Sequence, residues 1–121
     1  MSKANSPRMR RINEAIKELV AERLPELKDP RIGFVTLTEV RTATDLGVAQ
    51  VFVTVLPDDE DTVTQTLAGL KSASPLLRHE VGSRLRIKRV PDLHFVHDPL
   101  PAVGRRIDAL LEEAQDRDAD R

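Results

Sequence analysis

The chain has 121 residues and a mass of 13.5 kDa, which corresponds to one domain that can bury a core without disulfides or metals. It contains no Cys, which excludes disulfide frameworks, thiolate metal sites and Cys nucleophiles. Its formal net charge of -1 and its 2% aromatic content do not, by themselves, indicate a protein that binds nucleic acids.

The first predicted element is an amphipathic helix over residues 8–24, and Pro25 is expected to end it. Before it, residues 1–7 lack the apolar stretch of a secretory signal and are expected to be flexible. No apolar run approaches the ~18 residues of a membrane span, so a soluble cytoplasmic protein is expected. The helix has its apolar stripe at Ile12, Ile16, Leu19, Val20 and Leu24.

Two strands are predicted next, over residues 33–40 and 48–56. Val35 and Leu37 share one face of the first strand, and small or β-branched residues alternate along the second. The polar segment between them has its corner at residues 45–47. A short connection of this kind favours an antiparallel hairpin.

The next helix opens with carboxylates at residues 58–61, which suit the positive end of a helix dipole. Its apolar stripe contains Val63, Leu67 and Leu70. Ser74 and Pro75 predict an interruption, because Pro cannot continue a helix but suits its first position, and Ser is a good N-cap. A separate helix is therefore expected from Pro75 to about residue 85.

The last predicted elements are a strand over residues 93–97 and a helix over residues 105–113. Leu93 and Phe95 share one face of the strand, and a basic extended link at residues 86–91 precedes it. Residues 112–121 are almost all charged or Ala and are expected to form a disordered tail. The predicted order is α-β-β-α-α-β-α. The last helix has its apolar residues at Ile107, Leu110 and Leu111.

The charge is balanced in total but unevenly distributed along the chain. Residues 1–31 have a net charge of +3, residues 32–70 of -5, residues 71–91 of +5 and residues 92–121 of -4. Opposed patches of this kind orient a protein on a polyanion. The alternative for the basic stretch is an ordinary solvated helix face.

Signals of catalysis are weak. The glycine-rich phosphate loops and the nucleophile-elbow motif are absent. His94 and His97 lie three residues apart on a predicted strand, so they face opposite sides and make a poor metal pair. The carboxylates at residues 58–61 lack the spacing of a calcium loop. We expect no enzyme activity, no metal and no cofactor.

Any contact with RNA is expected to be electrostatic rather than to involve base stacking. Proteins that stack bases expose aromatic rings, whereas we expect at least two of Phe34, Phe52 and Phe95 to lie in the core. Ser74 and the first turn of the helix after it would present free N–H groups to an anion, with Arg78 one turn further on.

Several blocks of the sequence, in order, resemble the ribosome-binding factor A family over residues 8–112. No single block is specific, but all of them occur in the order and at the length of that family. The blocks are RRI at 10–12, KDPRIG at 28–33, VTLT at 35–38, AQVFV at 49–53, LLRHEVG at 76–82, RLR at 84–86, RVPDLHF at 89–95 and GRRIDALL at 104–111.

The resemblance implies an α+β, type-II KH-like domain with a three-stranded sheet, helices on one face, and no G-x-x-G loop. The family replaces that loop by an interhelical kink of Ala-x-Gly type. This chain has Ala73, Ser74 and Pro75 there, so Pro stands in place of Gly. The domain is expected at residues 8–111.

The resemblance also implies a non-enzymatic, cytoplasmic factor that is monomeric when free. It would bind the small ribosomal subunit and its precursor 16S rRNA, assist late maturation and 5′-end processing, and be linked to growth in the cold. The expected RNA-binding residues are Lys71, Ser74, Arg78, Arg84, Arg86, Lys88 and Arg89, with Arg8, Arg10, Arg11 and Arg31 widening that face.

Two other hypotheses remain. An adaptor would use the acidic hairpin region and tail to bind a basic protein. A small hydrolase of ferredoxin-like build has almost no support in the sequence.

Overall fold

The structure is a computed structural model, and it describes residues 6–99. The elements occur in the order α1 (Pro7–Arg23), the 3-10 turn η2 (Leu24–Glu26), β1 (Phe34–Thr42), β2 (Val48–Leu56), α2 (Glu60–Arg84) and β3 (Asp92–His97). The helix predicted at 105–113, the tail at 112–121 and most of the N-terminal segment at 1–7 lie outside the described residues.

The first helix follows from its capping residues and its apolar stripe. The Ser6 hydroxyl accepts a hydrogen bond from the Met9 backbone N–H, and Pro7 occupies the first helical position. The predicted core stripe is confirmed, since all five residues are buried. Pro25 lies in η2, directly after the helix, as expected.

The three strands form one mixed sheet in the order β1-β2-β3. The predicted hairpin is confirmed: β1 pairs antiparallel with β2, with a bulge between Leu37 and Glu39. β3 pairs parallel with β2, from Val48 opposite Asp92 to Val53 opposite His97. A parallel neighbour requires a long crossover, and α2 provides it.

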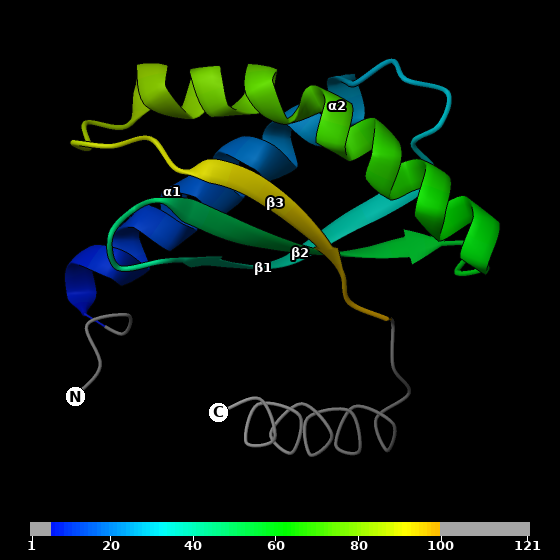
Figure 1. Cartoon of the computed structure of the whole chain (residues 1–121), viewed down its shortest axis with the longest axis horizontal. Coiled ribbons are helices and arrows are strands. Elements are labelled where there is room, and N and C mark those ends of the chain that lie inside the picture. Colours follow the sequence, from blue (N-terminus) through cyan, green and yellow to red (C-terminus); the bar gives the residue numbers. More distant parts are fainter. Residues whose placement is uncertain (1–5, 100–121) are drawn as a thin grey trace.

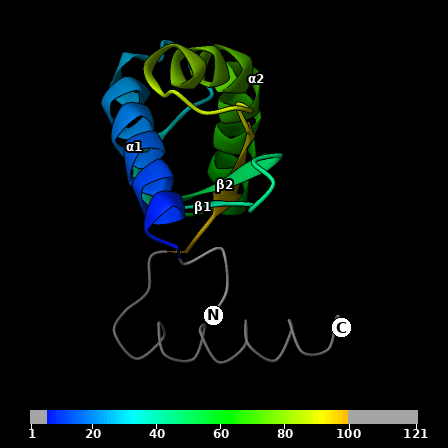
Figure 2. The same ribbon diagram turned by 90° about the vertical axis from the view of Figure 1, so that its left-hand side faces the viewer.

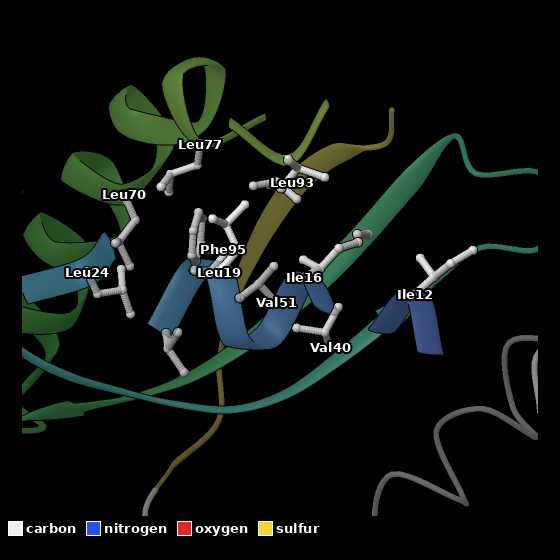
Figure 3. Packing of buried hydrophobic residues seen from close by; sticks show 14 of the residues in the cluster. Ile12, Ile16, Leu19, Leu24, Val40, Val51, Leu70, Leu77, Leu93 and Phe95 are labelled. Atoms are coloured by element: carbon white, nitrogen blue, oxygen red, sulfur yellow. The ribbon is translucent and has the colours of Figure 1, made fainter. Parts of the chain in front are cut away.

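Both long helices cover the same face of the sheet (Figures 1 and 2). Side chains from α1, α2 and the inner face of the sheet meet between these layers (Figure 3). Ile16, Val51, Leu70 and Leu77 are almost completely buried there. The α+β fold inferred from the resemblance is thus confirmed.

The predicted break at Pro75 is wrong, because residues 60–84 form one continuous helix with Pro75 inside it. The helix changes direction near its middle (Figure 1). Pro75 removes one backbone donor, but Leu70 before it and Leu77 after it are both buried against the sheet. Packing of both halves outweighs the lost hydrogen bond and keeps the helix continuous.

Candidate nucleic-acid interface

A groove of about 680 Å³ lies between α2 and β3. Its floor is apolar, with Leu67 from α2 and Leu93 and Phe95 from β3. Polar groups stand around this floor on both sides. They are Lys71, Ser74 and Arg78 from α2, and Asp92 and His94 from β3. Three of the residues predicted to bind RNA therefore share one groove.

The two cations of the groove differ in how firmly they are held. Arg78 donates to the Val90 carbonyl at 2.9 Å, and its Nε lies 3.2 Å from a carboxylate oxygen of Asp92. Both contacts fix the guanidinium at the rim, but Asp92 neutralises part of its charge. Lys71 is exposed and has neither an ion-pair nor a hydrogen-bond partner within residues 6–99. Lys71 is therefore the freer of the two cations.

Ser74 does not cap a helix, contrary to the prediction. Its hydroxyl donates to the Leu70 carbonyl at 3.0 Å, one turn back in the same helix. Because α2 continues through this point, no helix N-terminus opens onto the groove. The predicted anion site at the N–H groups after Ser74 is therefore wrong, and an anion there would meet side chains instead.

A second group of predicted cations lies at one end of the molecule, which we call the basic end. The loop between α2 and β3 lies at the same end as the start of α1 and the β1–β2 turn (Figures 1 and 2). Two hydrogen bonds tie these segments: Asn13 accepts from the Thr42 N–H, and Gly47 accepts from the Asp92 N–H. The exposed cations of the basic end are Arg8, Arg10, Arg11, Arg86, Lys88 and Arg89.

Arg84 belongs to neither group. Its guanidinium pairs with Glu22 of α1 at 3.1 Å. One turn earlier in α2, Glu80 pairs with Arg23 of α1 at 2.7 Å. Arg84 thus joins the two helices to each other, and its charge is already partly neutralised.

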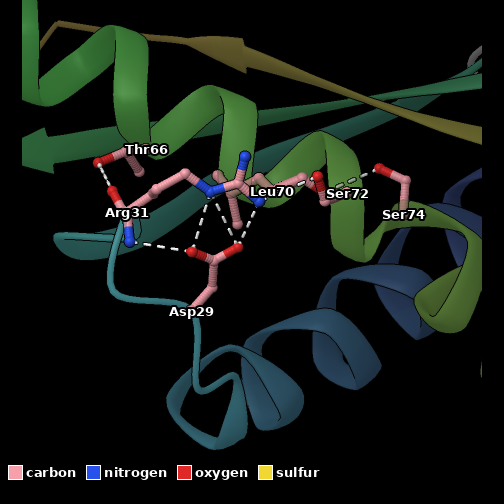
Figure 4. A network of polar contacts seen from close by, with 6 residues as sticks. All are labelled: Asp29, Arg31, Thr66, Leu70, Ser72 and Ser74. Carbon is pink, nitrogen blue, oxygen red and sulfur yellow. Dashed lines mark hydrogen bonds and ion pairs between the residues drawn. The ribbon is translucent and has the colours of Figure 1, made fainter.

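Arg31 lies on a different side of α2 from the groove (Figure 4). It forms a bidentate pair with Asp29 and donates to the Ser72 hydroxyl at 3.0 Å. The Thr66 hydroxyl accepts from the Gly33 N–H at 3.1 Å and so ties the same loop to α2. Arg31 therefore anchors the segment before β1, and its contribution to a wider RNA-binding face stays a prediction.

The pairing with Arg31 lowers the pKa of the Asp29 carboxyl group. The hydrogen bonds from the Arg31 side chain, and then from its backbone N–H, lower the pKa of Asp29 from 3.8 to about 2. A depressed folded pKa stabilises the fold above the unfolded value, and this contribution is lost as the pH falls towards 2. We expect an NMR titration of the Asp29 carboxyl to show a midpoint near 2.

Arg31→Ala is expected to raise that midpoint towards 3.8, because the side-chain contribution is removed. Arg41→Ala, which removes a cation elsewhere, should leave it unchanged. A midpoint near 3.8 in the unaltered chain would contradict the pairing in Figure 4.

The aromatic residues are only partly where they were expected. Phe95 is buried, and Phe52 is half-buried, with the Arg41 guanidinium 5.3 Å from the centre of its ring. Phe34 is 70% exposed, so the expectation of at least two core residues holds only for Phe95. Phe34 begins an edge strand and points away from the helices, a position that composition does not reveal.

The two histidines of β3 lie on its opposite faces, as the alternation predicts: His94 is exposed beside the groove, and the His97 Nε2 is buried. Within residues 6–99, no three His, Asp or Glu side chains gather as metal ligands would. In the same range, no helix is long and apolar enough to cross a membrane.

Comparison with known proteins gives one consistent result. A family model described as Ribosome-binding factor A matches residues 8–111. Ribosome-binding factor A of Clavibacter michiganensis subsp. michiganensis is 48% identical over 114 residues, which cover 93% of this chain and 68% of the relative. That of Geobacter sulfurreducens is 45% identical over 109 residues, which cover 89% of this chain and 92% of the relative.

Solved structures show the same likeness. The crystal structure of ribosome-binding factor A from Thermus thermophilus is 28% identical with a TM-score of 0.62, over 73% of this chain and 93% of that one. A putative ribosome binding factor A from Thermotoga maritima, solved by NMR, is 27% identical with a TM-score of 0.66. The match covers 81% of this chain and 96% of that one.

A third structure is a homology model of the Thermus thermophilus factor, fitted into a cryo-EM map of its complex with the 30S subunit. It is 30% identical to this chain with a TM-score of 0.57, over 69% of this chain and 88% of that one.

Proposed function

The chain belongs to the ribosome-binding factor A family, whose members are assembly factors and not enzymes, and we propose that it binds the small ribosomal subunit. One observation carries the proposal: a homologue 30% identical to this chain is fitted into the map of a complex with that subunit. The groove and the basic end supply surfaces that suit its RNA.

The groove suits a single strand of RNA. Lys71 and Arg78 stand on its helix side, where each can contact a phosphate. Leu67 is half-buried and offers an apolar contact to a base, and no stacked aromatic platform is needed for it. The groove therefore favours recognition of the RNA backbone and shape over readout of base edges.

The basic end extends this surface. Its cations are exposed and belong to two segments, the start of α1 and the loop before β3, so they can contact phosphates that lie several nucleotides apart. Arg84 and Arg31 have structural parts in this proposal: Arg84 joins α2 to α1 through Glu22, and Arg31 holds the segment before β1 through Asp29. Ser74 contributes to the shape of the groove but has its hydroxyl engaged.

We extend the proposal to the finer function that the resemblance to the family implies. The protein binds precursor 16S rRNA, assists its late maturation and the processing of its 5′ end, and supports growth in the cold. It acts in the cytoplasm, is monomeric when free, and uses residues 8–111 as its RNA-binding domain with 112–121 as a charged tail. Such a factor needs only a difference in affinity between immature and mature RNA states.

Binding of the full chain to purified small subunits, measured by co-sedimentation over a range of salt concentrations, tests this function. The logarithm of affinity is expected to fall linearly with the logarithm of salt, by about 0.7 for each phosphate neutralised. Large subunits serve as the control and should bind weakly.

A flat salt response, or no co-sedimentation, would contradict the proposal. An association with a protein partner that survives ribonuclease would instead support the adaptor hypothesis, for which Asp58, Glu60 and Asp61 offer an exposed acidic surface.

A further inference from the structure

The face of the sheet turned away from α1 and α2, here called the outer face, is unusually apolar. Side chains alternate along β2, and Ala49, Val51, Val53 and Val55 point into the core. The residues between them therefore point outwards. Of the four exposed large apolar residues within residues 6–99, three lie on the outer face: Phe34 at 70%, Leu56 at 43% and Val48 at 39% exposure.

Two cross-strand pairs organise this apolar surface. Phe34 lies directly opposite Leu56 at one end of the sheet, and Phe52 lies opposite Val96 further along. Directly opposed side chains lie within reach of each other, and the pair Thr36 and Thr54 lies in the row between the two apolar pairs. We call the side chains of Phe34, Leu56, Phe52 and Val96 the strip. Apolar patches of this kind are normally covered in a soluble protein.

The described chain leaves β3 towards the outer face. The Asp98 N–H donates to the Val53 carbonyl at 2.7 Å, and the Asp98 carboxylate accepts from the Thr38 hydroxyl of β1 at 3.2 Å. Figures 1 and 2 both show the short segment after β3, coloured orange, leaving on the side of the sheet opposite to the helices. The described part of the chain therefore ends beside the outer face.

The sequence after Pro99 is suited to covering this strip. Ile107, Leu110 and Leu111 have the spacing of one helix face, and that face must be buried to be stable. The family model reaches residue 111 and so includes all three. Residues 100–104 can extend over about 17 Å, whereas crossing the three strands takes about 10 Å.

We propose that the outer face is the docking site for residues 105–113 of the same chain, with Ile107, Leu110 and Leu111 packed on Phe34, Leu56 and Phe52. RNA fits this face poorly. Its cation, Arg41, already pairs with Glu39 and lies over the Phe52 ring. The proposal is independent of ribosome binding.

The composition makes a sensitive experiment possible, because the chain contains neither Trp nor Tyr. Phe34→Trp places a single fluorophore on the outer face, and Leu76→Trp places one on the exposed surface of α2 as the control. In the full chain, we expect acrylamide to quench the Phe34→Trp reporter several-fold less than the Leu76→Trp reporter, with emission at a shorter wavelength.

A second substitution in residues 105–113 should remove that protection. Leu110→Asp, and separately Ile107→Asp, are expected to raise quenching of the Phe34→Trp reporter to the level of the Leu76→Trp reporter, which itself should not change. Arg117→Asp, outside the docking segment, should leave both reporters unchanged. Far-ultraviolet circular dichroism confirms that each variant is folded.

Equal quenching of the Phe34→Trp reporter with and without Leu110→Asp would overturn the proposal. Protection that appears only at high protein concentration would show that a second copy covers the face. Protection that appears only after small subunits are added would show that the subunit covers it. Either result also overturns the proposal.

Discussion

Replacing Arg86, Lys88 and Arg89 together with Gln is expected to weaken binding to small ribosomal subunits roughly 50-fold at 0.15 M salt. With a slope of about 0.7 for each phosphate, one lost contact costs about 4-fold at that concentration, and three such losses multiply. The log–log salt slope should decrease by about 2. Co-sedimentation at several salt concentrations measures both quantities.

Arg84 is left out of this variant because its pairing with Glu22 joins the two helices. Removing it would mix a structural effect with a binding effect. The three chosen cations are exposed, so the melting temperature should change little. Lys17→Gln with Lys28→Gln is the control for loss of charge away from the basic end, and its slope should remain close to that of the unaltered chain.

An unchanged salt slope in the triple variant would show that the loop before β3 does not contact phosphate. In that case the salt dependence would have to come from the remaining cations, which are Arg8, Arg10 and Arg11 at the start of α1 and Lys71 and Arg78 in the groove. Because the two surfaces are built from different segments, the same assay applied to Lys71→Gln distinguishes them.

Much of the fold could be predicted because its patterns are local. The stripe of α1, the hairpin and the opposite facing of His94 and His97 follow from periods of 3.6 and 2. The continuity of α2 through Pro75 could not be predicted in this way. It depends on packing of Leu70 and Leu77 against strands that lie far away in the sequence.

The candidate site was harder to predict than the fold, because a run of charge in the sequence is not a patch on the surface. Lys71 and Arg78 are seven residues apart, about two helical turns, and share the groove. Arg84, six residues further on, lies on another side of the helix and meets Glu22. Helical periodicity alone could have separated it from the other two.

The groove itself required the tertiary structure. Its second wall is β3, and only the parallel pairing of β3 with β2 brings Asp92 and Phe95 alongside α2. The place of Arg31 was missed for a similar reason. Its short-range partner, Asp29, is visible in the KDPRIG block. Its other partner, Ser72, lies 41 residues away in the sequence, so the tertiary structure was needed to find that contact.

Gly69→Val is expected to destabilise the contact between α2 and the segment before β1. A Cβ at position 69 would lie 2.6 Å from Cγ1 of Ile32 and 3.3 Å from a carboxylate oxygen of Asp29. Overpacking of this kind costs about 1–3 kcal/mol, and Val recovers only a few tenths through helix propensity. We therefore expect a loss of about 2 kcal/mol and a melting temperature roughly 10 °C lower.

The same substitution should disturb the acid titration, because the added side chain would push the segment before β1 away from α2 and loosen the Asp29–Arg31 pair. The pKa of Asp29 should then rise from about 2 towards its ordinary value. Ala68→Val adds bulk at the preceding position, which is exposed, and costs only about 0.5 kcal/mol of helix propensity. If both variants melt alike and the Asp29 titration is unchanged, the close approach at Gly69 does not hold that segment in place.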